Sequence, residues 1–323
     1  MDAPSIRKKL TRWYENAQRD LPWRRTREPY PIWISEIMLQ QTRVGAVIPY
    51  YQRFLARFPD PAALAKAHED DVLALWSGLG YYSRARNLQK AAKQIVDAGE
   101  FPATHEGILE LAGVGSYTAA AIASISFGLP HAVVDGNVRR VFARLTNNAN
   151  VDTQALADKL LDRRDPARWN QAVMELGALV CVPKSPLCGE CPLANHCMAR
   201  AEGTQGEVPG KKIKPQTELR ERTLFVIRRS GKILLVPSNK VKGFWDLPER
   251  LPGARLGEVL GTFTHTITHR RYTFTVRRAP GKAPKGSRWF EEHKLGDSPC
   301  GTTAKKALRI SSDSPNGAAA DAS

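Results

Sequence analysis

Four of the five cysteines in this 323-residue chain lie close together, in the stretch CVPKSPLCGECPLANHC. Cys181, Cys188, Cys191 and Cys197 are spaced C-x6-C-x2-C-x5-C, and Cys300 has no partner by spacing. Structural zinc sites usually combine two pairs of the C-x2–4-C type, and only one such pair occurs here. Four thiols crowded on one short loop are more typical of an iron–sulfur cluster. The spacing therefore favours a cluster, with zinc second and a disulfide third.

Composition limits the environment and the partner. The first residues, MDAPSIRKKLTRWYENAQRD, are polar and lack the apolar segment of a secretory signal. No stretch approaches the roughly 18–20 apolar residues of a membrane helix. We therefore expect a cytoplasmic protein, in which structural disulfides are rare. Lys and Arg total 48 against 32 Asp and Glu, and the net charge of +16 favours nucleic acid as a partner over a basic protein without one.

The chain is expected to contain two folded domains and two polar segments. Residues 1–201 carry apolar residues at helical spacing, with Gly and Pro at the joins. Residues 202–220 have the composition of a linker. Residues 221–296 contain β-rich runs on both sides of a Ser-Gly pair and a second strand pair in LGTFTHTITHRRYTFTVRR, which predicts a small α+β domain. Residues 297–323 are small and polar, and we expect a disordered tail.

Two glycines in LAGVGSYTAAAIASISFG precede a long helical pattern. Gly113 and Gly115 would permit a tight turn, and the amides at the following helix start could face a phosphate. The stretch therefore predicts a helix–hairpin–helix unit that grips a DNA backbone. A helix connection without this role uses glycine equally often and is the alternative.

Two carboxylates stand out for their surroundings. Glu36 lies inside the apolar run YPIWISEIMLQQT, where burial would raise its pKa and keep it protonated, unless it faces solvent from an amphipathic helix. Asp135 precedes a helical pattern, so capping alone can explain it. The amides of a helix start would also favour its ionised form, which could face a developing positive charge. A protonated Glu and an ionised Asp form the pair that glycosidic bond cleavage uses.

Several of these stretches together resemble one known group of proteins. LAGVGSYTA, VDGNVRRVFAR and the cysteine spacing resemble the helix–hairpin–helix DNA glycosylases that carry a 4Fe–4S cluster. WISEIMLQQT and GLGYYSRARNL narrow the resemblance to the adenine DNA glycosylase (MutY) family. The similarity is dense over about residues 5–200 and weaker over 221–296, which resembles that family's Nudix-like domain. It implies a mainly α glycosylase domain of two helical subdomains and an α+β domain, with the four clustered cysteines holding a 4Fe–4S cluster.

The resemblance also implies an activity and a setting. The substrate would be adenine mispaired with 8-oxoguanine, or less readily with guanine, in double-stranded DNA. The base must leave the stack before its N-glycosidic bond can be hydrolysed in base excision repair. The related endonuclease III family places a lyase lysine where this chain has Tyr117, which cannot form a Schiff base. We therefore expect a monofunctional enzyme. The resemblance further implies a monomer, associated with the nucleoid in a bacterial cytoplasm.

Roles for individual residues follow from the same resemblance. Glu36 would protonate adenine at N7, and Asp135 would stabilise the oxocarbenium-like sugar, supported by Tyr117 and Asn137. The residues that would contact the base or the DNA are Trp23 and Arg24 in the adenine pocket, Gln41 and Tyr81 beside the lesion, Gly113 and Gly115 in the hairpin, and also Leu39.

The C-terminal domain is expected to recognise and not to hydrolyse, because residues 221–296 lack the glutamate-rich box that binds magnesium in hydrolytic Nudix enzymes. In the family, a Phe-Ser-His loop reads 8-oxoguanine. The aligned residues here are Ile267, Thr268 and His269, so the hydroxyl and the imidazole are kept while the aromatic ring is lost. Ordinary cross-strand pairing on a hairpin is the alternative.

The sequence features allow three alternatives to adenine excision. The first is an endonuclease III-like glycosylase with lyase activity. The second is a DNA-binding protein without catalysis, in which the cluster is structural or senses redox state. The third is a zinc-bearing nucleic-acid module.

Overall fold

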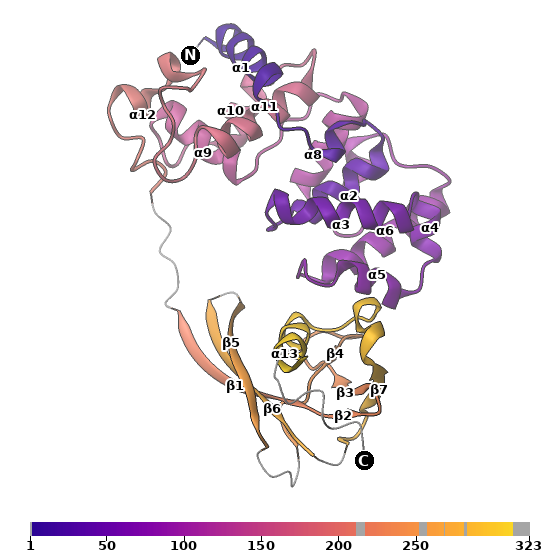
Figure 1. Ribbon diagram of the computed structural model, residues 1–323. Coiled ribbons are helices and arrows are strands. Elements are labelled where there is room, and N and C mark those ends of the chain that lie inside the picture. Colours follow the sequence, from indigo (N-terminus) through magenta and orange to yellow (C-terminus); the bar gives the residue numbers. More distant parts are fainter. Residues whose placement is uncertain (1, 211–216, 252–256, 268, 281–282, 313–323) are drawn as a thin grey trace. The chain divides into compact units, whose positions relative to one another are not determined.

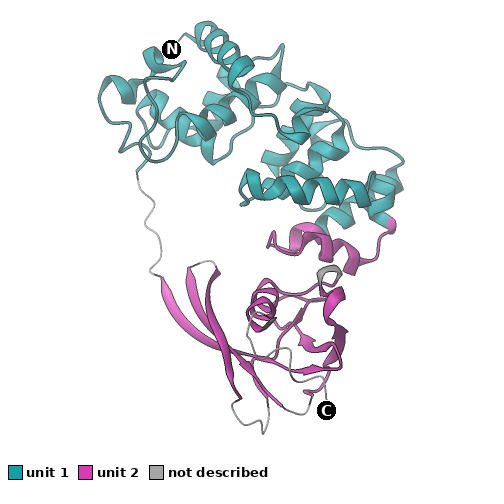
Figure 2. Cartoon of the chain, in the orientation of Figure 1, with its two compact units in different colours: residues 1–65, 87–212 teal, residues 66–86, 213–323 magenta. Residues whose placement is uncertain are grey.

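The computed structural model describes residues 2–210, 217–251, 257–267, 269–280 and 283–312. The chain divides into two compact units, residues 1–65 with 87–212 and residues 66–86 with 213–323 (Figure 2). The first unit therefore differs in one respect from the helical domain that was expected over residues 1–201. Residues 66–86 group with the C-terminal residues instead.

The first unit is helical, as predicted (Figure 1). Residues 2–210 contain no strand. The helices that lie wholly or partly in this unit are α1 (Ala3–Ala17), η1 (Pro22–Arg24), α2 (Pro29–Leu39), α3 (Val44–Arg57), α4 (Pro61–Lys66), α6 (Ser83–Ala98), α7 (His105–Leu109), α8 (Ser116–Phe127), α9 (Gly136–Thr146), α10 (Thr153–Leu160), α11 (Pro166–Leu179), η2 (Ala194–His196) and α12 (Met198–Ala201).

Two groups of helices make up this unit, in agreement with the expected subdomains. Helices α1, α9, α10 and α11 share a core in which Leu10, Phe142 and Trp169 are each at most 2% exposed. Helix α2 packs against α3 and α8, and α8 also contacts α11, which joins the groups. Every side chain of α2 from Ile32 to Met38 is buried, because a helix that is apolar on all sides is stable only when neighbours surround it.

The predicted helix–hairpin–helix unit is formed by α7, the turn at Gly113–Gly115 and α8. Gly113 has φ +79°, and a Cβ atom there would lie 2.6 Å from the Cβ of Asn87. Both the left-handed backbone and the close approach therefore require glycine at this position. Gly115 is the N-cap residue of α8.

The second unit contains the α+β domain predicted from the β-rich runs. Strands β1, β6 and β5 form one sheet in that order, with β1 parallel to β6 and β5 antiparallel to it. The other sheet has the order β2-β3-β4, with β7 also paired to β3. The elements are α5 (Glu69–Trp76), β1 (Glu218–Val226), β2 (Arg228–Arg229), β3 (Lys232–Pro237), β4 (Trp245–Asp246), β5 (Val259–Ile267), β6 (Arg270–Arg278), β7 (Arg288–Glu291), η3 (Glu292–Asp297) and α13 (Thr302–Ser312).

Two of the expected boundaries are wrong. Strand β1 begins at Glu218, inside the segment expected to be a linker. Residues 302–312, expected to be disordered, form α13, whose Ala304, Ala307 and Leu308 join the core of the second unit. Residues 313–323 of the predicted tail lie outside the described residues.

Residues 66–86 pack within the second unit. The Oγ of Ser77 donates a hydrogen bond to the carbonyl of Cys300 at 3.0 Å, and the ring of Tyr82 lies 4.1 Å from that of Phe244. Their sequence is helical and resembles the residues around it, so only tertiary contacts reveal this grouping.

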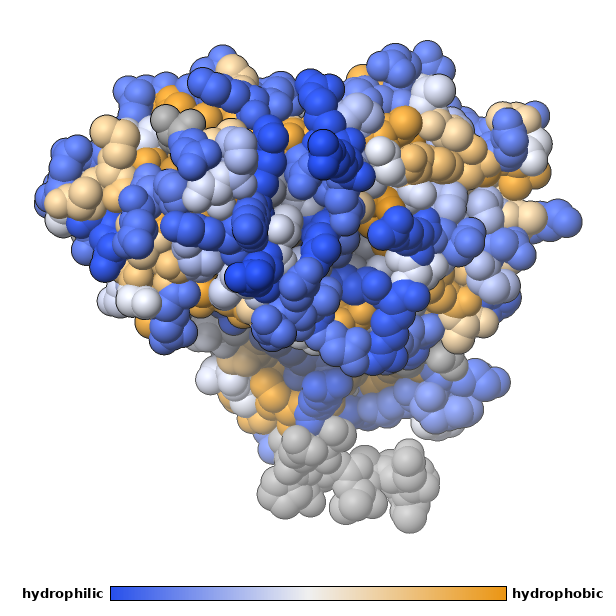
Figure 3. Space-filling view, turned by 90° about the horizontal axis from the view of Figure 1, so that it is seen from above, coloured by the Kyte–Doolittle hydropathy of each residue, from blue (hydrophilic) through white to orange (hydrophobic). Residues whose placement is uncertain are grey.

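The surface is rich in polar side chains. Figure 3 shows strongly hydrophilic residues over much of one face, with apolar residues in smaller patches between them. Among the described residues, no helix combines the length and the apolar character needed to cross a membrane.

Candidate active site and cluster loop

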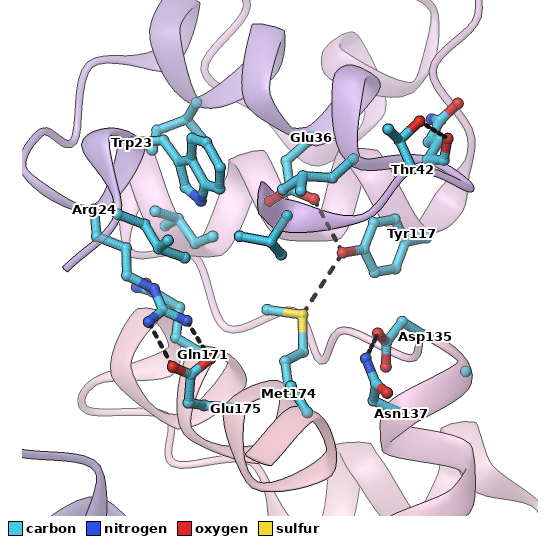
Figure 4. Close-up of a pocket in the computed structure, with 18 of the residues that line it drawn as sticks. Trp23, Arg24, Glu36, Thr42, Tyr117, Asp135, Asn137, Gln171, Met174 and Glu175 are labelled. Carbon is cyan, nitrogen blue, oxygen red and sulfur yellow. Dashed lines mark hydrogen bonds and ion pairs between the residues drawn. The ribbon is translucent and has the colours of Figure 1, made fainter. Parts of the chain in front are cut away.

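A cavity of about 600 Å³ in the first unit collects most of the predicted site residues (Figure 4). Its walls come from η1, α2, α8, α11 and the start of α9. The predicted residues that line it are Trp23, Arg24, Glu36, Leu39, Gln41, Tyr117, Asp135 and Asn137. Segments more than 100 residues apart in the sequence, such as α2 and α11, therefore meet around one space.

Glu36 is buried on α2, with 6% of its surface exposed. The hydroxyl of Tyr117 donates a hydrogen bond to its Oε2 at 3.0 Å. Burial, with a smaller effect from the charge of Asp135, raises the pKa of Glu36 to about 7, although the Tyr117 hydrogen bond and Arg24 act in the opposite direction. Of the two alternatives for Glu36, the structure shows the buried one.

Tyr117 stands in the first turn of α8 and points into the cavity (Figure 4). Burial raises its pKa well above the usual value, and the nearby carboxylates act in the same direction. Its hydroxyl also lies 3.6 Å from the Sδ of Met174 on α11. Tyr117 therefore remains protonated and acts as a neutral donor to Glu36.

Asp135 is the N-cap residue of α9. Its Oδ1 accepts a hydrogen bond from the backbone amide of Val138 at 2.7 Å, and its Oδ2 accepts one from the Nδ2 of Asn137 at 2.9 Å. Capping accounts for the first contact. The same carboxylate also lines the cavity that contains Glu36, so capping does not exclude a chemical role.

Asn137 is held from behind by Arg140. The guanidinium of Arg140 donates to the Oδ1 of Asn137 at 2.9 Å and to the carbonyl oxygens of Gly177 and Cys181, each at 2.7 Å. A Cβ atom at Gly177 would lie 2.6 Å from the Cβ of Asn137, so this contact has no room for a side chain. A chain of hydrogen bonds thus runs from Asp135 to the first residue of the cysteine loop.

Sequence reasoning missed Glu175, a second buried carboxylate in the cavity wall. It lies on α11, is 1% exposed, and accepts hydrogen bonds from the guanidinium groups of Arg19 and Arg24 at 2.6–3.0 Å. Burial alone would raise its pKa, but the hydrogen bonds from Arg19 and Arg24 outweigh it and lower the pKa to about 2. Glu175 is an anion that fixes the position of Arg24.

The remaining predicted contact residues lie elsewhere. Tyr81 belongs to the second unit, has φ +47° and is 52% exposed. Gly113 and Gly115 form the hairpin turn. His269 lies next to β6, with its Nε2 3.4 Å from a carboxylate oxygen of Glu218. Thr268 lies outside the described residues.

The four clustered cysteines line one small cavity together with Arg144, Arg200 and Gln205. All four are free thiols, and three of them pack against the core shared by α1, α9 and α11. Within the described residues, no three His, Cys, Asp or Glu side chains are placed to hold one metal ion. Four thiols around a space bordered by arginines, with no carboxylate, suit an anionic iron–sulfur cluster, whose irons would supply the positive charge that thiolate ligands need.

Comparison with known proteins agrees with this geometry. Residues 34–165 match the HhH-GPD superfamily of base excision DNA repair proteins, and residues 181–197 match the iron-sulfur binding domain of endonuclease III. A thermostable thymine-DNA glycosylase structure covers 62% of this chain and 97% of its own, with 28% identity and a TM-score of 0.59. The structure of an endonuclease III–DNA complex is similar in fold, with a TM-score of 0.56 and 23% identity. It covers 64% of this chain and 99% of its own. The fold and site define a helix–hairpin–helix DNA glycosylase with a 4Fe–4S cluster.

Relatives of known activity narrow the class. The adenine DNA glycosylase of Mus musculus is 33% identical over 98% of this chain and 79% of its own length. That of Homo sapiens is 33% identical over 96% and 74%. The chain belongs to the adenine DNA glycosylase family, and the predicted fold class, enzyme class and cluster are confirmed.

Proposed function

We propose that this enzyme removes adenine mispaired with 8-oxoguanine, or with guanine, from double-stranded DNA, and that it does so by hydrolysis alone. The observation that carries the proposal is the cavity in which a buried Glu36, with its pKa raised to about 7, shares one space with Asp135. The cavity volume of about 600 Å³ lies within the range of roughly 300–1,000 Å³ that is typical of small-molecule pockets. An extruded base therefore has room there.

Glu36 supplies the proton in this mechanism. Tyr117 donates to its Oε2, which leaves Oε1 to carry the acidic proton toward N7 of the adenine. Protonation turns the base into a neutral leaving group, so the electron pair of the glycosidic bond can pass to it as the bond breaks. A carboxyl group with a pKa close to the working pH is best suited to this transfer.

Asp135 stabilises the sugar that is left behind. The oxocarbenium-like sugar carries positive charge, and the carboxylate of Asp135 is held at the cavity wall by Val138 and Asn137. Water then adds to C1′ and loses a proton to a carboxylate. Fixed charge that needs no reorganisation during the reaction is an effective source of catalysis.

The composition of the cavity supports hydrolysis without a lyase step. Lyase chemistry needs an amine that can form a Schiff base with the sugar. The described residues that line the cavity include Arg19, Arg24 and Arg139 but no lysine.

We further propose that the second unit is Nudix-like and reads 8-oxoguanine through the turn at Ile267–His269. Ile267 is the last residue of β5, and His269 directly precedes β6. Replacement Thr268→Ala should lower the preference for 8-oxoguanine over guanine opposite adenine, and an unchanged preference would contradict this assignment. The same proposal places a monomeric enzyme at the nucleoid of a bacterial cytoplasm.

The test is incubation with a duplex that carries adenine opposite 8-oxoguanine, followed by strand analysis with and without alkali. Cleavage that appears only after alkali is expected, because hydrolysis leaves an intact abasic strand. Cleavage without alkali would indicate a lyase. No abasic product at all, with DNA binding retained, would indicate a binding protein.

A further inference from the structure

Gln205 lines the cysteine cavity and carries a buried polar atom without a partner. Its Oε1 is buried and has no hydrogen-bond partner, and its side chain lines the cavity with the four cysteines. A buried amide oxygen without a donor costs free energy. An oxygen also has nothing to accept from thiolates or sulfides, which offer no proton.

The amide orientation of a glutamine is assigned from its hydrogen bonds, because its oxygen and nitrogen have nearly the same shape. A half-turn of the Gln205 amide exchanges Oε1 for Nε2 and brings two N–H donors to the cavity. Sulfur atoms of a cluster are acceptors. The orphaned oxygen therefore marks the place where a donor fits once the cluster is bound.

Arg144 reaches the same cavity from α9. It is 3% exposed, and its Nη1 lies 3.4 Å from the Sγ of Cys181. Nη1 also donates to the carbonyl oxygen of Val182 at 2.8 Å, while Nη2 donates to that of Pro183 at 3.1 Å and Nε to that of Val208 at 2.8 Å. These contacts hold the plane of the group in place, so one N–H is directed at a cluster ligand.

We propose that Arg144 and Gln205 are positioning residues that donate hydrogen bonds to sulfur atoms of the cluster and thereby set its reduction potential. Donors to sulfur stabilise the more negatively charged, reduced cluster, so they raise the potential. Arg144 acts on the Cys181 sulfur, and Gln205 acts as a second donor from the lining of the same cavity. This inference goes beyond the proposed excision reaction and does not depend on its substrate.

The test is a redox titration of the full-length, cluster-loaded protein without DNA, in which electron paramagnetic resonance follows the oxidised fraction. Gln205→Leu is expected to increase the ratio of oxidised to reduced cluster about tenfold at a fixed potential, which is 59 mV for a one-electron couple. Gln205→Met keeps the length of the side chain and should give the same direction. Gln52→Leu, an exposed change on α3, is the matched control and should leave the titration unchanged.

Iron content separates tuning from a merely structural role. The proposal requires a shifted midpoint in at least one of the two apolar Gln205 variants while its iron-to-protein ratio stays at the wild-type value. Arg144→Lys keeps the charge but loses the planar fork, so it should lower the midpoint and speed iron loss to a chelator. Unchanged midpoints in the loaded variants, or loss of iron without any shift in the iron that remains, would overturn the proposal.

Discussion

Glu36 and Glu175 line the same cavity on α2 and α11, and both are buried, yet their protonation differs. Glu36 faces the neutral hydroxyl of Tyr117, and its pKa rises to about 7. Glu175 faces the cationic groups of Arg19 and Arg24, and its pKa falls to about 2. Burial is common to both, so the neighbouring groups decide which carboxyl keeps a proton. Glu36 can thus deliver a proton, while Glu175 only fixes the positions of the arginines around it.

The largest expected effect concerns the third carboxylate of the cavity. Asp135→Asn should abolish adenine release in a single-turnover assay, because the positive sugar loses its counter-charge. The amide oxygen of the asparagine can still accept the capping hydrogen bond from the backbone amide of Val138. Duplex binding and thermal stability should therefore remain close to wild type. A joint loss of binding and activity would indicate that Asp135 is only a cap.

Glu36→Gln tests the role of Glu36 as the proton donor. Its excision rate at neutral pH should fall by about 10²–10⁴-fold, the range typical of a lost general acid. The amide preserves the shape of the side chain and can still accept from Tyr117. Turnover close to wild type would remove Glu36 from the acid role.

Glu175→Gln tests the structural role of the other buried carboxylate and is the counterpart of the previous change. The free energy of unfolding should fall by about 3 kcal/mol, since two guanidinium groups lose a buried anion. The value lies at the lower end of the usual range because the side chain of Arg19 is 34% exposed and water can reach it. Urea unfolding measures the change, and an unaltered midpoint would show that water alone solvates both arginines.

The smallest expected effect is the pH dependence of stability that Glu36 contributes. A carboxyl whose folded pKa lies above its unfolded value stabilises the fold below the unfolded pKa, and this stability is lost as pH rises through 4.5 to about 7. Between pH 5 and pH 7 the wild type should therefore lose about 2 kcal/mol relative to Glu36→Gln. Glu175 should give the opposite slope, with stability lost as pH falls from 4.5 toward about 2. If the free energies of unfolding of wild type and Glu36→Gln change in parallel over pH 5–7, the predicted contribution of Glu36 is contradicted.

Local patterns in the sequence predicted some features well. The cysteine loop is one short segment, so its spacing alone indicated a cluster. Asp135 precedes a helix, so its capping was predictable, whereas the apolar run around Glu36 left burial and a solvent-facing position as alternatives. Their chemistry suggested a catalytic pair, but their meeting in one cavity depends on tertiary packing that no local pattern predicts.

Other features depend on contacts between distant segments. Glu175 was missed because its partners lie about 150 residues earlier in the chain, and no local pattern connects them. Helix α13 was missed because the residues after Gly296 are mostly small and polar, and this composition hid the helical spacing of the buried Ala304, Ala307 and Leu308. Residues 66–86 group with the second unit through contacts such as that of Tyr82 with Phe244.

The most direct test of the central claim is to measure the pKa of Glu36 itself. Carbon-13 carboxyl spectra of protein labelled at glutamate, compared with those of Glu36→Gln, would identify its signal as the pH is varied. A titration midpoint near 7 is predicted, with the signal absent from the variant. A midpoint near the ordinary value of 4.5 would mean that Glu36 is ionised at neutral pH, and it could not then be the acid that releases the base.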